Sequence, residues 1–278
     1  MHRLNVLISG AGIAGCTLAY WLARYGHSAT VVERSGALRS SGAPVDVRGP
    51  AAEIAKRMGI VPRLREASTR ISGLSVLDWE GRLSGQVDLE ALRRSIAPQE
   101  SSRAATSRLS CMSPLALLIF WHPEMSDFDP ADDDQHKRIL ETTFAGIGWK
   151  VPEILKAVRA TSDLYFDSVS KVQLTTWTRG RIALLGDASS CVSRFGDGST
   201  LAITGAHTLA TALAENSADH DAASRQYQAQ HGKLVRPKQK NLSLIASILV
   251  PKTQLGIAVR DRALGILRLY AAIKGWVP

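Results

Sequence analysis

The sequence has few of the features that mark secreted, membrane-spanning or metal-binding proteins. Its three cysteines, Cys16, Cys111 and Cys191, are odd in number, and their spacing fits neither a disulfide framework nor a metal site. The longest apolar run, residues 242–250, is stopped by Pro251 and is too short to cross a membrane. We therefore expect a cytoplasmic protein with no membrane span and no metal.

The chain also lacks a block of like charges. Its net charge is +9 and its pI is near 9.7, but lysine and arginine are spread along the 278 residues. Such a distribution does not predict nucleic-acid binding, whereas it suits a small anionic, phosphate-bearing ligand. No catalytic triad or acid–base pair stands out, so catalytic residues remain unassigned.

What is present begins with a glycine-rich turn between two strand patterns. Residues 4–9 predict a strand, GAGIAG follows at 10–15, and a helical pattern covers 16–25. Residues 29–32 predict a second strand that ends at Glu33. An acid at this spacing binds a ribose hydroxyl pair and disfavours a 2′-phosphate, so NADP is not expected at this turn.

Each glycine of this turn has a distinct physical role. Gly10 permits the tight turn, Gly12 lets a pyrophosphate approach the backbone, and Gly15 lets the helix lie close to the strand. Ile13 and Ala14 lie at the start of the helix, where N–H groups and the helix dipole attract phosphate. The motif predicts a dinucleotide cofactor, either FAD or NAD.

A second motif, RIALLGDASSCVSRFGDGS, lies at residues 181–199. Residues 182–185 predict a buried strand that ends at Gly186-Asp187, and Gly196-Asp197-Gly198 follow. One interpretation is a strand-to-helix turn capped by Asp187. The other is a ligand lying across the carboxyl end of a sheet.

Together the two motifs resemble those of the FAD-dependent aromatic hydroxylase-like monooxygenases, and most of all the bacterial branch that includes the tetracycline-modifying oxygenases. The resemblance rests on VLISGAGIAGCTLAYWLARYGHSATVVER, GAPVDVRGPAAEIAKRMGI and TTWTRGRIALLGDASSCVSRFGDGSTLAITGAHTLATAL. With the segment before Trp177 and the apolar C-terminal region, it covers about three quarters of the chain.

The resemblance implies FAD-binding roles for matched residues. Those expected at the pyrophosphate are Gly10, Gly12, Ile13, Ala14 and Gly15; at the adenosine, Glu33 and Arg34; along the cofactor and its flavin side, Arg48 and Arg93; at the sugar chain, Asp187; beneath the flavin, Gly196, Gly198 and Ser199. The helix after this loop, from about residue 201 to 215, would direct its N-terminus at the flavin. On the residues alone, Arg48 also fits an ordinary surface arginine.

The implied fold is α/β, with a Rossmann-like FAD-binding domain built from both chain ends and a reduced, β-rich substrate lobe between them. We assign residues 1–70 and 177–278 to the FAD-binding domain with its C-terminal helices. Residues 71–176 form the truncated substrate domain, with a linker at 95–114.

The truncation is inferred from what the middle of the chain lacks relative to the family. Glu90 and Arg93 match its Glu-x-x-Arg spacing, but the Gly-Asp-Leu that should follow is absent, and no Ala-Asp-Gly occurs anywhere. Residues 96–114 show no period and are rich in Ser, Arg and Ala, as a linker is. Residues 71–87 predict a strand pair, and residues 115–121 a further strand.

The implied activity is hydroxylation of an aromatic or polycyclic small molecule with O₂, FAD, and NADPH or NADH as electron donor. The alternative is a catalytically impaired FAD-binding remnant or interaction protein produced by internal deletion. An NAD-dependent dehydrogenase without flavin is disfavoured by the Gly-Asp region.

Other conspicuous residues have structural interpretations. Cys191, His207 and Trp177 fit packing positions better than reactive ones. The acids at 132–134 suit the first turn of a helix and require no metal.

Overall fold

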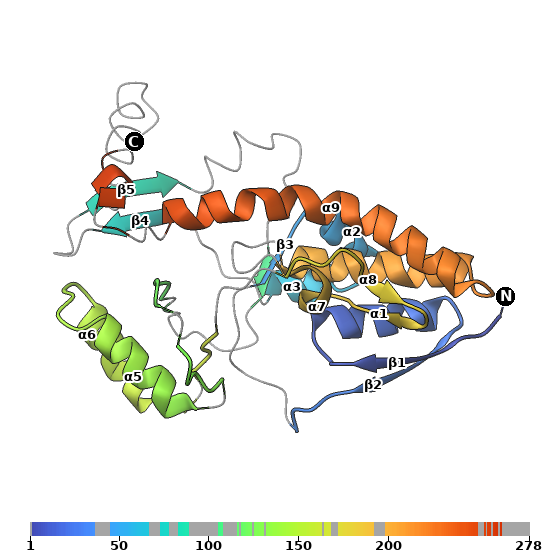
Figure 1. Cartoon of the computed structure of the whole chain (residues 1–278), viewed down its shortest axis with the longest axis horizontal. Coiled ribbons are helices and arrows are strands. Elements are labelled where there is room, and N and C mark those ends of the chain that lie inside the picture. The colour runs from blue at the N-terminus through green and yellow to red at the C-terminus, as the bar shows by residue number, and fades with distance from the viewer. Residues whose placement is uncertain are drawn as a thin grey trace. The chain divides into compact units, whose positions relative to one another are not determined.

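The structure is a computed structural model that forms two compact units (Figure 1). It describes residues 2–36, 45–66, 73–77, 83–88, 105–107, 116, 118–123, 125–130, 132–162, 164–167, 172–191, 198–249, 253, 255, 256, 258–260 and 262. The first unit contains Met1–Thr69, Ser102–Cys111 and Ser168–Leu242, and the second contains Arg70–Ser101, Met112–Asp167 and Ser243–Pro278.

The described elements are mixed α and β. The strands are β1 (Asn5–Ser9), β2 (Ser28–Val32), β3 (Val45–Val47), β4 (Gly73–Leu77), β5 (Leu83–Asp88), β6 (Ala105–Ser107), β7 (Thr178–Arg179) and β8 (Ile182–Ala183). The helices are α1 (Ile13–Arg24), α2 (Pro50–Arg57), α3 (Val61–Glu66), α5 (Asp133–Thr143), α6 (Val151–Ala160), α7 (Asp187–Ser190), α8 (Gly198–Glu215) and α9 (His220–Leu249).

The predicted β1–α1–β2 unit is present at the N-terminus. β1 and β2 are parallel and in register from Asn5 opposite Ser28 to Ser9 opposite Val32, with α1 as the connection between them (Figure 1). The helix begins at Ile13, earlier than predicted, and ends at Arg24 before the left-handed Gly26 (φ 79°). Parallel strands joined through a helix are the nucleotide-binding arrangement that the glycine spacing indicates.

Helix α8 forms the centre of the first unit. Every residue from Thr200 to Ala206 is buried, and most are small, so neighbouring helices approach it closely. It packs mainly against α1, through Trp21 and Leu22 of that helix, and also against α2. The core is thus built by helices from the two ends of the chain.

Helix α9 runs unbroken for 30 residues, with Pro237 inside it. Its buried residues Tyr227, His231 and Val235 join the core around α8, and Gly205 of α8 leaves the space that the His231 ring occupies.

Two predictions about strands in the first unit are wrong. Residues 182–185 are not a buried strand of the parallel sheet: only Ile182–Ala183 is extended, it pairs antiparallel with β7, and Ile182 is 70% exposed. The segment 95–114 is not linker throughout, because Ala105–Ser107 forms β6 and pairs antiparallel with β3. The first segment forms a short hairpin with its sequence neighbour β7, and the second pairs with β3, some 60 positions earlier in the chain.

The second unit contains the predicted strand pair, in which β4 and β5 are antiparallel with an irregularity at Val76/Leu77. The strand predicted at 115–121 does not form at its described positions, 116 and 118–121, although Leu118 and Phe120 pack against the core of α5 and α6. The described part of this unit therefore holds one β-hairpin, a helix pair and the C-terminal end of α9, and it is less rich in strands than predicted.

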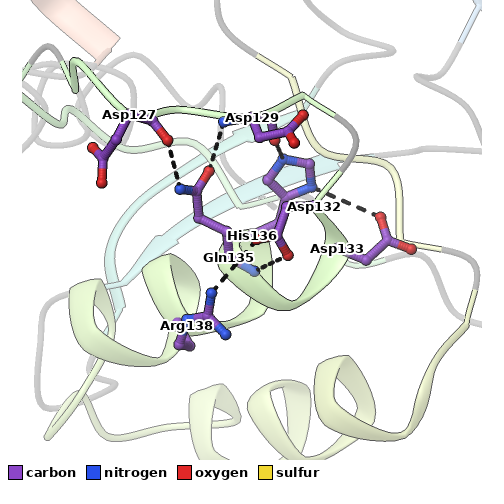
Figure 2. A network of polar contacts seen from close by, with 7 residues as sticks. All are labelled: Asp127, Asp129, Asp132, Asp133, Gln135, His136 and Arg138. Carbon is purple, nitrogen blue, oxygen red and sulfur yellow. Dashed lines mark hydrogen bonds and ion pairs between the residues drawn. The ribbon is translucent and has the colours of Figure 1, made fainter.

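The acids before α5 cap this helix, as predicted (Figure 2). The Asp132 carboxylate accepts the Gln135 backbone N–H at 2.8 Å, and the Gln135 side-chain amide donates to the Asp127 carbonyl at 2.9 Å. His136 is buried, and its Nε2 donates to the Asp129 carbonyl at 3.1 Å. The cluster fixes the N-terminus of the helix.

Candidate functional site

The glycine-rich turn has the geometry of a phosphate-binding loop. Gly10 is left-handed (φ 105°), and its N–H donates to the Val32 carbonyl at 2.7 Å, which fixes the turn beside β2. A Cβ on Gly15 would lie 2.0 Å from the Gly10 carbonyl oxygen, so the close approach of helix and strand requires glycine there. A Cβ on Gly12 would meet no protein atom within 4 Å, so its backbone faces open space.

The N-terminus of α1 adjoins this open space. The helix begins at Ile13 and Ala14, with Gly12 as N-cap, no side chain capping it and no acid in its first turn. Uncapped N–H groups and a positive helix dipole favour a bound anion. The residues present therefore fit the pyrophosphate of a dinucleotide.

Glu33 closes the turn from the end of β2. Its carboxylate accepts the Ala11 backbone N–H at 2.8 Å and the Ser35 N–H at 2.9 Å. The Ser35 N–H, followed by the Ala11 N–H, lowers the pKa of Glu33. The carboxylate is consequently ionised and held at the edge of the turn, with Arg34 next to it and exposed.

The Gly-Asp motif lies against the same turn. Gly186 is buried and left-handed (φ 63°), and a Cβ on it would lie 2.9 Å from the Ala14 Cβ. Asp187 is the first residue of α7 and lies next to Gly186, so it lies beside the first turn of α1 although it is 173 positions after Ala14 in the sequence. Because the Asp187 side chain is exposed, it can meet a ligand lying across the turn.

Helix α9 holds the Gly-Asp segment in place. The buried Tyr227 hydroxyl donates to the Leu184 carbonyl at 3.0 Å, and burial raises the pKa of Tyr227 to about 12. The Trp177 backbone N–H donates to the Gln228 side chain at 3.1 Å. Sequence reasoning did not identify Tyr227 or Gln228, because neither belongs to a recognisable motif.

The remaining candidate residues fall at the N-terminus of α8 or outside the described residues. Gly198 and Ser199 form the first turn of α8, and the Arg48 backbone N–H lies 3.4 Å from the Thr200 hydroxyl in the same turn. The Arg48 side chain is exposed. Arg93 and Gly196 lie outside the described residues.

Two of the residues interpreted as packing positions, Trp177 and His207, do pack. Trp177 is buried against Tyr227 and His231. His207 is half-buried, 4.7 Å from the Trp21 ring, and accepts a hydrogen bond from Arg57 at 3.1 Å. Burial, followed by the Arg57 charge, lowers the pKa of His207.

Within the described ranges, no three His, Cys, Asp or Glu side chains gather as metal ligands. Nor does any helix in that part of the chain have the length and apolar character to span a membrane.

Comparisons with known proteins identify flavin-dependent relatives. Residues 5–96 match the family model described as FAD dependent oxidoreductase. Rv1260, an uncharacterized protein of Mycobacterium tuberculosis, is 28% identical over 84% of this chain and 91% of its own length. A flavin-dependent monooxygenase of Legionella longbeachae is 26% identical over 86% of this chain and 87% of its own.

The same fold occurs in solved structures. The tetracycline destructase Tet(51) superposes with a TM-score of 0.72 at 22% identity and covers 95% of this chain and 96% of its own. A single-substitution variant of HpxO from Klebsiella pneumoniae, solved with FAD, superposes with a TM-score of 0.66 at 17% identity, and the match covers 99% of this chain and 97% of that chain.

The chain is thus similar to FAD-dependent oxidoreductases over residues 5–96 and to a flavin-dependent monooxygenase over most of its length, and it shares its fold with solved structures of that kind. In the alignment with Rv1260, 84% of 278 residues is about 234, so about 100 of the 338 aligned positions lie opposite gaps in this chain.

Proposed function

We propose that this protein binds FAD and uses it, with O₂ and NADPH or NADH, to hydroxylate an aromatic or polycyclic small molecule. The observation that carries the proposal is the meeting of the two motifs: Gly186 contacts Ala14, so Asp187 lies beside the glycine-rich turn. An NAD-only dehydrogenase has no need of this second contact.

The proposed division of roles follows from the residues present. The N–H groups of the turn and of the first turn of α1 would hold the pyrophosphate. Glu33 would accept the adenosine ribose hydroxyls, and Asp187 those of the sugar chain on the flavin side. Gly198 and Ser199, at the positive end of α8, would face the flavin. Bound FAD supplies the electron transfer and oxygen activation, for which no amino-acid side chain suffices.

A second candidate is an FAD-binding protein with impaired hydroxylation. The gaps opposite about 100 positions of Rv1260 favour it, since a shortened chain has less protein with which to cover the cofactor. Poor exclusion of water from such a site diverts reducing equivalents to hydrogen peroxide.

One set of measurements tests both candidates. The visible spectrum after FAD addition reports cofactor binding. NADPH consumption, hydrogen peroxide and hydroxylated product are then measured together over a panel of aromatic compounds. Product in proportion to NADPH supports the monooxygenase, and peroxide in proportion to NADPH supports the impaired form. Failure to bind FAD, or recovery of NAD from the protein, overturns both.

A further inference from the structure

Helix α9 carries far more basic than acidic residues, a feature that was not identified from the sequence. Between His220 and Leu249 it carries five cations and one acid, Asp221. Four of the cations, Arg225, Lys233, Arg236 and Lys240, are exposed. At 100° per residue these four fall within an arc of about 80°, so they form one stripe along the helix.

A groove runs beside this stripe. It has a cavity volume of about 490 Å³, and one wall consists of Thr176, Thr178 and Gly180. These alternate residues line the groove while Trp177 between them points into the core. The other wall is α9, which includes Arg225 and Arg236 of the stripe.

The two walls are fastened to each other, so the groove is preformed. The side chain of Gln228 accepts the Trp177 N–H and donates to the Thr175 carbonyl, each at 3.1 Å. At the tip of the β7–β8 hairpin, Arg181 Nε donates to His220 Nε2 at 3.4 Å. Because the groove is already fixed, little conformational entropy is lost when a ligand binds.

The polar groups of the groove suit phosphate. Arg225 and Arg236 are 11 residues apart, which is three helical turns or about 16 Å. The Thr178 and Ser224 hydroxyls also line the groove. Guanidinium groups bind phosphate through paired hydrogen bonds, and the volume is in the range of small-molecule sites. The only carboxylate of the lining is Asp221.

We propose that this groove binds an elongated small organic ligand with two separated phosphate groups, one at Arg225 and one at Arg236. A nucleotide coenzyme with two separated phosphate groups has this chemistry. None of the lining residues belongs to the candidate FAD site, so the proposal is independent of the proposed function.

The test compares NADP⁺ with NAD⁺, which differ by one phosphate, in calorimetric titrations of the full chain with and without added FAD. NADP⁺ should bind more tightly than NAD⁺. The double variant R225Q/R236Q should weaken NADP⁺ binding at least about tenfold and abolish the preference. R63Q/R65Q removes the same charge from the exposed face of α3 and should change the affinity less than about twofold.

Two further variants make the result specific. Asp221→Asn should strengthen NADP⁺ binding by about twofold, because it removes a like charge from the groove. Gly12→Val blocks the glycine-rich turn, so retained NADP⁺ binding in that variant places the ligand outside the cofactor turn whether or not FAD binds. The proposal would be overturned if the two double variants lost NADP⁺ affinity equally, or if Gly12→Val no longer bound NADP⁺. It would also be overturned if the protein bound single-stranded DNA or anionic vesicles but not NADP⁺.

Discussion

Replacing Gly12 and Gly15 separately distinguishes a ligand site from a packing contact. The two glycines lie three residues apart, yet a Cβ on Gly15 would lie 2.0 Å from the Gly10 carbonyl oxygen, whereas a Cβ on Gly12 would meet nothing within 4 Å. We therefore expect Gly15→Ala to act on the fold and Gly12→Val to act on the cofactor alone.

The magnitudes follow from the contacts. The Gly10 oxygen is backbone and cannot rotate away, so Gly15→Ala must displace α1 from β1. Overpacking of this kind costs up to about 3 kcal/mol, which lowers the Tm of a unit of this size by about 6–12 °C. Gly12 is extended (φ −72°, ψ −174°), a conformation open to any residue, and replacing an N-cap glycine costs about 1 kcal/mol or less.

The assay is thermal melting of each variant without FAD, followed by titration with FAD and detection by flavin fluorescence. Gly12→Val should melt within about 4 °C of the parent, and its FAD affinity should fall at least about a hundredfold, because the side chain fills the pyrophosphate's space. Parental affinity in Gly12→Val would show that the turn does not hold the cofactor. An unchanged Tm in Gly15→Ala would refute the close contact.

Three further variants test the rest of the site and its support. Asp187→Ala should weaken FAD binding by about 1–3 kcal/mol with little change in Tm, and equal affinity by titration would remove Asp187 from the site. Gly186→Ala should lower both Tm and FAD affinity, because Gly186 is left-handed and a Cβ would lie 2.9 Å from the Ala14 Cβ; melting at the parental temperature would contradict this packing. Burial lowers the pKa of His231 from 6.5 to about 4. On acidification this imidazole is therefore protonated in the unfolded chain at a higher pH than in the folded protein. Its contribution of about 3 kcal/mol to stability is present above pH 6.5 and is lost as the pH falls to about 4. His231→Leu should flatten the Tm-against-pH profile in that window, and matching profiles would exclude His231 as the cause.

The N-terminal β1–α1–β2 unit was predictable because its signals are local. The glycine spacing, the apolar runs on each side and Glu33 lie within 30 residues, and each element appears within three residues of its predicted bounds. The Gly-Asp motif was recognised for the same reason.

The errors concern elements whose strand pairing the local pattern does not reveal. The apolar residues 182–185 predict a buried strand, but Ile182–Ala183 forms a short hairpin with the neighbouring β7, and Ile182 is exposed. β6 lies in a segment without hydrophobic period, since its partner β3 is some 60 positions away. The basic stripe of α9 was missed because its cations are spaced along the sequence, and only the helical period brings them onto one face.

The packing of α1 against α8 also has a consequence for how the chain is made. More than 170 residues separate the end of α1 at Arg24 from the start of α8 at Gly198. At about 5–20 residues per second, a ribosome needs about 9–35 s to synthesise the partner that buries Trp21 and Leu22. During that interval the nascent chain presents an apolar helix face. We expect this unit to fold only after α9 has been synthesised, because α9 residues complete its core.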